Sequence, residues 1–551
     1  MPRYDDEYYD GYDEEEEVLA PPQEENIILH HTPWWAISAA FHAMLLLAIW
    51  SITLSAVEEK PKKIMMAAIE NYELPEPPKI LPPNVLPEDR DDRPIDNPTE
   101  DPRICKDAED DHNEDPTNQP FHELRPNPNP NRSNVEGPYP QKGFNSSIGL
   151  GGNIGGGGGP GGRGGFQYRR ARGGGGHKGD QNVMWALYWL RDHQQEDGVW
   201  SADGFHAMCG RPSRHGKHVF QRQGRCSNKN GGDDRGWKMA TDGVTGLATL
   251  AFLGAGYTQE EGEFKVTVKK ALRYLLAIQT DDGCFGPKDD EHYVYNHAIS
   301  TMAVAEAYAM TGAKKLKGPA QRAVDFIASA QNEDPDRGYL GWRYGVKPGE
   351  SDGSVTGWMV LALKSARAAQ LSIPDHCWEG AKRLYDDLTG DVNGYPKTGY
   401  ITKGGPNARL REAASFLPNP SIDAINVLCR LFMGVPRTNS LLQRQASIIT
   451  QPNNLPTIED KTKIDLYYWY YASLAIFQMG GSYWKKWEDP MIKALTGSQR
   501  TEDMKQCVYG SWDPIGAWGM PGGRVYATAI NCLTLEVYYR YEFLGANKSG
   551  R

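Results

Sequence analysis

Four aspartates stand where acid–base chemistry is possible, because each lies at or near the start of an apolar helical segment. They are Asp242, Asp352, Asp423 and Asp465. A carboxylate at a helix start commonly caps the helix by accepting backbone N–H hydrogen bonds. A carboxyl group in an apolar mouth instead has a raised pKa, which suits it to act as a general acid or base. We expect one of these two roles, capping or proton transfer, at each position.

Aromatic and imidazole side chains recur beside these aspartates and predict the wall of a ligand site. The candidates are Tyr295, His297, Trp358, Tyr468, Trp469, Trp518 and Tyr526. Aromatic faces can stabilise a carbocation or hold a sugar ring. Packing inside the core is the alternative interpretation of each ring.

The segment 201–241 concentrates cysteine and histidine in a long insertion, with His206, Cys209, His215, His218 and Cys226. A Cys209–Cys226 disulfide is the interpretation we favour for an oxidising compartment. A zinc site and two separate thiols are the alternatives, although the spacing fits no standard zinc finger. Apart from this zinc alternative, we expect no cofactor. The run 233–235, Asp-Asp-Arg, indicates a solvated turn.

Residues 34–57 form a largely apolar segment without formal charge, and this segment is long enough to cross a bilayer. They predict a transmembrane anchor within residues 30–57. Ser38 and His42 lie four residues apart and therefore share one helix face. An ionisable residue in a span is a functional candidate, and a neutral, packed histidine is the alternative.

The remaining N-terminal sequence divides by composition into three segments. Residues 1–29 hold eleven acidic residues and one arginine and predict a disordered tail. Residues 58–142 form a Pro- and Asp-rich spacer, and residues 143–178 a Gly- and Arg-rich tether. Few aromatic residues interleave the tether arginines, so we expect no nucleic-acid partner.

From residue 179 to about 545 apolar residues recur with a helical period, which predicts twelve helices in six hairpins. The first helices begin near residues 181, 264, 319, 376, 438 and 484, and their partners near 242, 296, 354, 421, 464 and 525. The partner helices are the more apolar set and should line an inner ring. The predicted fold is an all-α (α/α)6 toroid, with the four aspartates around one mouth.

Three stretches of this region share one pattern, in which a helix ends in glutamine and a Gly-aromatic turn follows. The glutamines are Gln194, Gln279 and Gln331, and the turns end at Trp200, Phe285 and Trp342. We expect the amide to bond the last carbonyls of its own helix, and glycine to permit a left-handed exit. The pattern resembles the QW repeat of squalene/hopene cyclases, which share a superfamily with protein prenyltransferases, and the resemblance implies the toroid.

The reactions of these families do not follow from the resemblance. The cyclase acid motif, Asp-x-Asp-Asp, is absent from residue 181 onward. The segment ending in Asp352-Gly353-Ser354 looks like the Asp-x-Cys zinc region of prenyltransferases, with serine in place of the cysteine. No histidine stands near residues 524–527 to complete that zinc site.

Residues 33–42 have the pattern Pro-Trp-Trp-x-x-Ser-x-x-x-His, which resembles the anchor of TonB-like energy transducers. The resemblance implies that Ser38 and His42 contact an ExbB/ExbD-like proton-channel complex in the inner membrane, and that the toroid is periplasmic. Lys60, Lys62 and Lys63, just after the span, favour the opposite orientation. We expect the periplasmic one, because long domains translocate despite such charges.

Two functions from different classes fit this sequence. The first is a membrane-anchored binding or scaffold module, coupled to the proton-driven complex. The alternative is an enzyme that processes a lipid or a glycan with the carboxylates at the mouth of the toroid.

Overall fold

The computed structural model describes His42, Met44 and residues 179–215, 218–229, 231–260, 262–290, 292–407 and 416–537. The chain divides into two units, Met1–Cys105 and Lys106–Arg551, and the elements described below belong to the second. The predicted tail, spacer and tether lie outside the described residues, as does the anchor apart from His42 and Met44, which are helical. None of the helices within the described ranges has the length and hydropathy needed to cross a bilayer.

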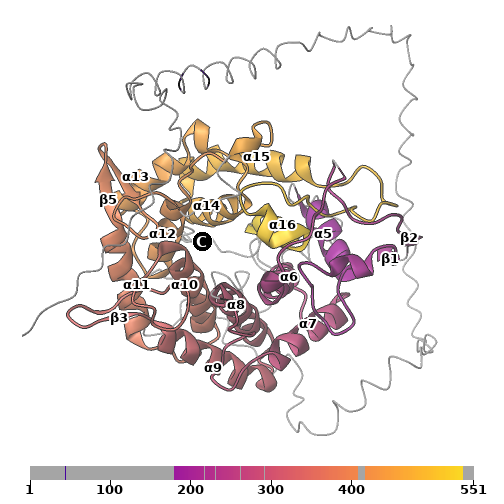
Figure 1. The fold of residues 1–551 in the computed structure, drawn as a ribbon, viewed down its shortest axis with the longest axis horizontal. Coiled ribbons are helices and arrows are strands. Elements are labelled where there is room, and N and C mark those ends of the chain that lie inside the picture. The colour runs from indigo at the N-terminus through magenta and orange to yellow at the C-terminus, as the bar shows by residue number, and fades with distance from the viewer. Residues whose placement is uncertain are drawn as a thin grey trace, which may run out of the picture. The chain divides into compact units, whose positions relative to one another are not determined.

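Twelve helices alternate between an outer and an inner ring in the described part of the second unit, as Figure 1 shows. The outer helices are α5 (Asp180–Asp192), α7 (Lys265–Ala277), α9 (Lys314–Ala330), α11 (Asp375–Leu388), α13 (Ser440–Ile449) and α15 (Gly481–Ser498). The inner helices are α6 (Thr241–Gly254), α8 (Tyr293–Thr311), α10 (Gly353–Ala368), α12 (Ser421–Phe432), α14 (Leu466–Met479) and α16 (Gly519–Leu535). The predicted toroid of six hairpins is confirmed.

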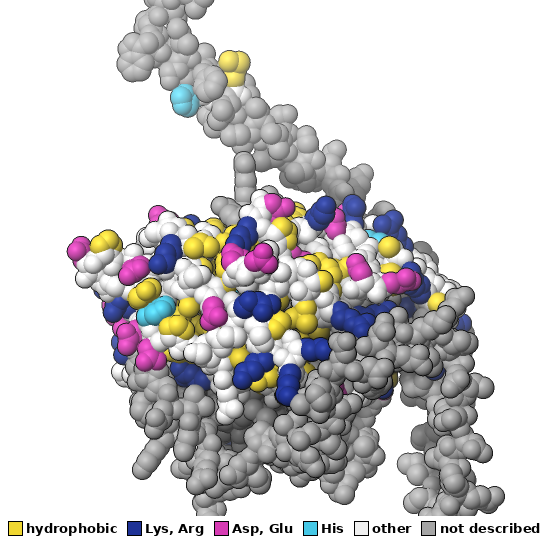
Figure 2. Space-filling view, turned by 90° about the horizontal axis from the view of Figure 1, so that it is seen from below, with side chains coloured by type: hydrophobic (Ala, Val, Ile, Leu, Met, Phe, Trp, Pro, Cys, Tyr) yellow, Lys and Arg dark blue, Asp and Glu magenta, His cyan; other side chains and the backbone are white. Residues whose placement is uncertain are grey.

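Burial follows this division into two rings. Each inner helix packs against the next, and α16 returns to α6, which closes the inner ring. Every residue of α10 and of α12 is buried, whereas α11 buries one face only. The outer surface seen in Figure 2 mixes lysine and arginine with acidic and apolar side chains. The more apolar partner helices therefore line the interior, as predicted.

Short elements occupy the connections between helices. Within the described residues, three antiparallel hairpins pair β1 (Pro212–His215) with β2 (His218–Gln221), β3 (Glu333–Asp334) with β4 (Gly338–Tyr339), and β5 (Thr389–Val392) with β6 (Tyr395–Thr398). The 3-10 turns are η1 (Phe205–Met208), η2 (Lys238–Ala240), η4 (Pro452–Asn454) and η5 (Lys461–Lys463).

The repeat glutamines join neighbouring hairpins. The Gln279 amide donates to the carbonyl of Gly283 at 3.1 Å and to that of Pro319, in the next outer helix, at 2.9 Å. Gln194 likewise reaches the Thr267 carbonyl at 3.0 Å. Our expectation that each amide bonds carbonyls of its own helix is therefore wrong for these residues.

The tryptophans perform the capping that we assigned to the glutamines. The Trp200 indole donates to the Leu190 carbonyl at 2.7 Å, and the Trp342 indole to that of Ile327 at 2.7 Å. These carbonyls lie in the last turns of α5 and α9, and that of Leu190 also accepts from the His193 amide at 3.1 Å.

The repeat glycine is required by a positive φ and by a close approach. Gly283 has a φ of 91°, and a Cβ built there would lie 2.2 Å from the Arg322 carbonyl oxygen of α9. Gly198 has a φ of 96°, and a Cβ built there would lie 2.2 Å from the Lys270 carbonyl oxygen of α7. The turn thus lies directly against the next outer helix.

A fourth copy of the pattern escaped the sequence analysis. Gln499 donates to the carbonyls of Gly510 and Asn182, each at 2.8 Å, and the Trp512 indole donates to the Leu495 carbonyl at 2.8 Å. The turn between Gln499 and Gly510 is much longer than that of the first two copies, which hid the pattern. This copy joins the sixth outer helix to the first.

Substitution of the repeat glutamine tests this arrangement. We expect Gln279→Ala to lower the free energy of unfolding by about 1–2 kcal/mol, because two carbonyls lose their donor. Gly283→Ala should cost about 2 kcal/mol or more through the positive φ and the contact with α9. Denaturant titration of the purified chain measures both.

The matched control is Gln443→Ala, at an exposed position of outer helix α13. It should change stability by less than about 0.5 kcal/mol. Equal losses in Gln279→Ala and Gln443→Ala would contradict the linking role.

Candidate functional site at the mouth of the ring

The first turns of the inner helices meet on one side of the toroid and form its mouth. The Asn296 amide donates to the carbonyl of Met239, just before α6, at 2.7 Å. The Tyr295 hydroxyl donates to Ser354 Oγ of α10 at 3.2 Å, and the amide of Asn419, before α12, donates to Asp465 at 2.8 Å. These bonds place the starts of α6, α8 and α10, and those of α12 and α14, next to one another.

The four predicted aspartates divide into two caps and two side-chain acceptors. Asp352 caps α10 through the amides of Ser354 and Val355, at 2.9 and 2.7 Å, and Asp465 caps α14 through that of Tyr468 at 3.0 Å. Capping is confirmed at these two positions.

Asp242 and Asp423 lie within the first turns of α6 and α12 and accept other donors. Asp242 accepts from the Tyr274 hydroxyl at 2.6 Å. Asp423 accepts from the Thr398 amide at 2.7 Å and from the Gln445 side chain of α13 at 2.9 Å, and therefore faces the outer ring.

Asp352 differs from the other three because one of its oxygens is unsatisfied. The residue is fully buried, and its Oδ2 has no hydrogen-bond partner among the described residues. The closest cation, Arg343 Nε, is 3.9 Å away. Burial raises the pKa of Asp352 to about 7, although the amides of Val355 and Ser354, the charge of Arg343 and the Tyr400 hydroxyl oppose the shift. Asp352 can therefore hold a proton near neutral pH, as can Asp423, whose pKa burial also raises to about 7.

Neutral hydroxyl groups surround the start of α10. Ser354 Oγ and the Tyr467 hydroxyl are 2.7 Å apart, and the hydroxyls of Tyr344 and Tyr400 are 2.9 Å apart. The guanidinium of Arg343 lies over the rings of Tyr344 and Tyr400, at 5.5 and 6.0 Å from their centroids. This hydroxyl cluster supplies donors and acceptors for a neutral polar group.

Four of the exposed apolar side chains among the described residues lie close to the starts of inner helices. The set, here called the apolar rim, comprises Met239 (43% exposed), Leu417 (48%), Ile515 (39%) and Met520 (48%). They flank α6, α12 and α16, and the partly buried rings of Tyr295, Trp518 and Tyr526 lie beside α8 and α16. The mouth thus joins apolar side chains to the hydroxyl cluster.

The predicted aromatic wall is only partly at the mouth. Tyr295, Trp518 and Tyr526 are half-buried there, whereas Trp358, Tyr468 and Trp469 are buried in the core. Trp358 packs against Tyr470 and Tyr471 of α14, with ring centroids 6.0 and 5.4 Å away. The interior beneath the mouth is therefore filled by aromatic packing.

Both nitrogens of His297 bond to backbone groups. Its Nδ1 accepts from the Phe285 amide at 3.1 Å, so Nε2 carries the proton and donates to the Ala323 carbonyl at 3.2 Å. Burial lowers its pKa to about 3. His297 thus positions the Gly-aromatic turn of the second repeat against α9.

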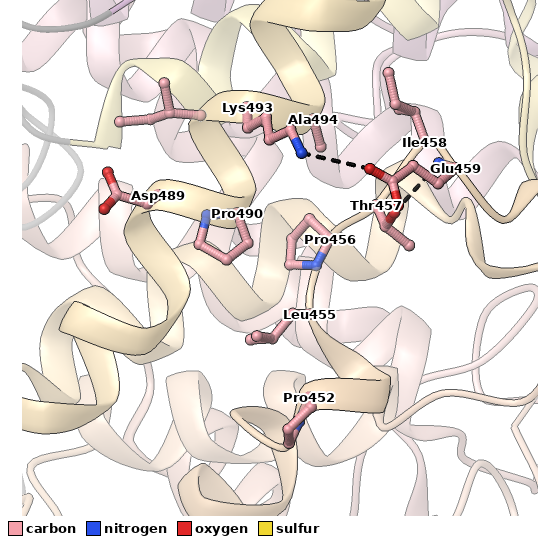
Figure 3. Close-up of a pocket in the computed structure, with 11 residues that line it drawn as sticks. Pro452, Leu455, Pro456, Thr457, Ile458, Glu459, Asp489, Pro490, Lys493 and Ala494 are labelled. Carbon is pink, nitrogen blue, oxygen red and sulfur yellow. Dashed lines mark hydrogen bonds and ion pairs between the residues drawn. The ribbon is translucent and has the colours of Figure 1, made fainter.

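Two hollows lie near the junction of α12, α14 and α15. One of about 310 Å³ adjoins the rim at Leu417, Asn419 and Tyr468. The other, of about 660 Å³, lies between Leu455–Glu459 and α15 and is shown in Figure 3. Prolines, Thr457, Asp489 and the Lys493–Glu459 ion pair line this larger hollow.

The insertion 201–241 brings two of its five predicted residues together, with partners that the sequence did not suggest. Cys209 and Cys226 are free thiols that converge with His193 of α5 and Cys507, a group whose four ligand atoms all lie within 4.8 Å of one another. The favoured disulfide is not formed in the structure. His193 and Cys507 were missed because 314 residues separate them and no spacing pattern links them.

His206 and His215 of the insertion are not among the four converging ligands. His206 bonds Asp234 at 2.7 Å, and the His215 ring stacks on Tyr188 with centroids 4.0 Å apart. His218 is in β2, and its side chain lies outside the described residues.

The prediction of a solvated turn at residues 233–235 is wrong for its central residue. Asp234 is buried and binds Arg524 of α16, which also pairs with Asp513 at 2.5 Å. A buried arginine with two carboxylates ties the insertion to the last inner helix.

A family model matches one part of this chain. The family model of the squalene-hopene cyclase C-terminal domain matches residues 237–400, which run from the start of α6 to the hydroxyl cluster. No curated protein matches the chain.

Solved structures resemble the chain at low identity. An inactive variant of the α-1,6-mannanase GH76A of Salegentibacter sp. HEL1_6, in complex with α-1,6-mannotriose, has 10% identity and a TM-score of 0.40, over 65% of this chain and 97% of that one. The cellobiose 2-epimerase of Spirochaeta thermophila has 11% identity and a TM-score of 0.37, over 56% and 88%.

The protonation of Asp352 can be tested through stability. The pKa of this carboxyl group is higher in the folded chain than in the unfolded chain. Such a group stabilises the folded chain fully at a pH below the pKa of the unfolded state. This stabilisation is lost as the pH rises through the pKa of the folded state. The variant Asp352→Asn can still cap α10 but cannot carry a charge. Between about pH 4 and pH 7, we expect the free energy of unfolding of the wild type to fall by up to about 1 kcal/mol per pH unit relative to this variant.

Denaturant titrations at several pH values measure this difference. Asp460→Asn is the control, because Asp460 caps η5 at the surface and its hydrogen bonds to Thr462 lower its pKa. Its difference from wild type should stay constant between pH 5 and 8. Parallel wild-type and Asp352→Asn curves would show that Asp352 is charged throughout.

Proposed function

We propose that the toroid is a binding module that takes an apolar or amphiphilic ligand of the lipid class at its mouth. The observation that carries the proposal is the apolar rim, whose side chains are about 40–50% exposed at the starts of three inner helices. Burying such side chains against hydrocarbon gives roughly 25 cal/mol per Å² of apolar surface. A hydrocarbon ligand would bury the apolar side chains of the rim, whereas a sugar would leave its own polar groups against them.

The hydroxyl cluster sets the polarity of the proposed ligand. Tyr295, Ser354 and Tyr467 form one chain of hydroxyls, and Tyr344 and Tyr400 another. Such groups can both donate to and accept from a neutral head group such as an alcohol. We therefore infer an apolar chain with a neutral polar end.

The family match supports the same ligand class. The matched segment, residues 237–400, contains Met239, Tyr295 and Tyr400. The matching family is named for squalene and hopene, which are isoprenoid hydrocarbons. An isoprenoid alcohol is therefore the first probe to use.

The predicted anchor gives the proposal a membrane setting. Residues 30–57 would hold the module beside the inner membrane, where lipid ligands are available, with the toroid on the periplasmic side. Coupling of Ser38 and His42 to an ExbB/ExbD-like complex would then connect ligand binding to the proton gradient.

Asp352 favours a second candidate function, an enzyme that transfers a proton to the bound ligand. A neutral carboxylic acid in an apolar setting is suited to protonate a weak base or an alkene. In that case Asp352→Asn would still bind the ligand and would no longer convert it, which product analysis by mass spectrometry would detect.

Charge placed on the rim tests the binding proposal. We expect Met239→Glu and Met520→Glu each to weaken binding of a neutral dansylated isoprenoid alcohol by about tenfold or more, because each removes apolar contact and adds a charge. Fluorescence titration of the full chain measures the affinity.

Val266→Glu is the matched control, since Val266 is 55% exposed on outer helix α7, away from the mouth. It should leave the affinity unchanged, and all three variants should unfold at the wild-type temperature. Equal affinities in the rim variants and the control would refute binding at the mouth.

A further inference from the structure

We propose that His193, Cys209, Cys226 and Cys507 together bind one structural Zn²⁺ ion. The distances from His193 Nε2 to the sulfurs of Cys507, Cys226 and Cys209 are 3.3, 3.4 and 3.8 Å. In a tetrahedral site with Zn–N near 2.0 Å and Zn–S near 2.3 Å, the nitrogen–sulfur edges are about 3.5 Å. The four side chains thus have the spacing of a Cys3His zinc site.

The hydrogen bonds of His193 leave the correct nitrogen for a metal. Its Nδ1 lies 2.8 Å from the Trp189 carbonyl, which can only accept a hydrogen bond, so Nδ1 carries the proton. The lone pair on Nε2 then points to the three sulfurs. A metal-binding histidine usually has this arrangement, with its other nitrogen donating to a carbonyl or a carboxylate.

The surroundings hold the ligands in place without the metal. Trp189 stacks on the His193 ring, with centroids 4.1 Å apart, and its indole donates to the Cys507 carbonyl at 3.0 Å. Arg222 donates to the same carbonyl at 3.0 Å. The Cys226 amide donates to the Cys209 sulfur at 3.4 Å, a contact that stabilises a thiolate.

A structural role follows from the number of ligands and their burial. Four protein ligands complete the tetrahedral coordination of a zinc ion, so no coordination position is left for water or a substrate. His193, Cys226 and Cys507 are buried, and Cys209 is partly exposed. The ion would therefore hold the chain together and would not catalyse a reaction.

A disulfide explains the cluster less completely than zinc. Three cysteines converge, and a disulfide between any two would leave the third thiol unpaired beside His193. Zinc uses all four side chains at once. The same ion would protect the thiolates from oxidation by occupying their lone pairs.

The proposed site joins the two ends of the ring. His193 follows α5, Cys209 and Cys226 belong to the insertion, and Cys507 lies between α15 and α16. The insertion also pairs with this last segment through Gln223, whose amide and carbonyl bond Lys505 and Cys507 at 2.6 and 2.9 Å. Zinc would reinforce the closure between α5 and α16, which lie side by side in Figure 1.

Elemental analysis of the full-length chain, purified without chelators, tests the site. We expect about one zinc per chain in the wild type and less than about one-tenth in Cys226→Ser and Cys507→Ser, because each loses a ligand. Cys377→Ser should keep the full content, since Cys377 is a buried cysteine of α11 outside the cluster.

Cobalt exchanged into the wild-type chain gives a second measurement that does not depend on folding of the variants. Tetrahedral thiolate ligation would produce intense visible bands and a sulfur-to-cobalt charge-transfer band in the near ultraviolet. Wild-type chain with no zinc, with iron in its place, or with a Cys209–Cys226 disulfide in its peptide map would overturn the proposal. Equal zinc in Cys226→Ser and Cys377→Ser would do so as well.

Discussion

Four of the six junctions between the described outer helices depend on one repeated contact, in which a glutamine amide leaves its own helix and bonds a carbonyl near the start of the next outer helix. Gln194, Gln279 and Gln499 each bond the glycine carbonyl of their own turn and a carbonyl of the following hairpin. Each amide thereby fixes the distance and the direction from one hairpin to the next.

The sequence predicted the fold well because its signals are local. Helical periodicity and the contrast between apolar and amphipathic helices are contained in short windows, so all twelve helices were located. The role of the repeat glutamine was misassigned, because its partner lies in the next hairpin. Nothing in the residues around Gln279 reveals that the Pro319 carbonyl, 40 positions away, accepts from it.

The candidate site was predictable only in part, for the same reason. Capping by Asp352 and Asp465 follows from local rules, whereas the unsatisfied oxygen of Asp352 depends on burial by distant segments. The cysteine cluster needed Cys507, far along the chain from Cys209. The depth of Trp358 in the core could not be read from the sequence either, because an aromatic residue on an inner helix suits a lumen and a packed interior equally.

The contacts between α16 and α5 have a consequence for the biosynthesis of this protein. An open helical repeat array can add units one at a time, with each new unit stabilised as soon as it meets the last. Here the first hairpin must wait for the sixth, because Asn182 and Gln499 are 317 residues apart. At ordinary synthesis rates of about 5–20 residues per second, that wait is tens of seconds with an apolar edge uncovered. We therefore expect the nascent chain to need a chaperone until its last helix has left the ribosome.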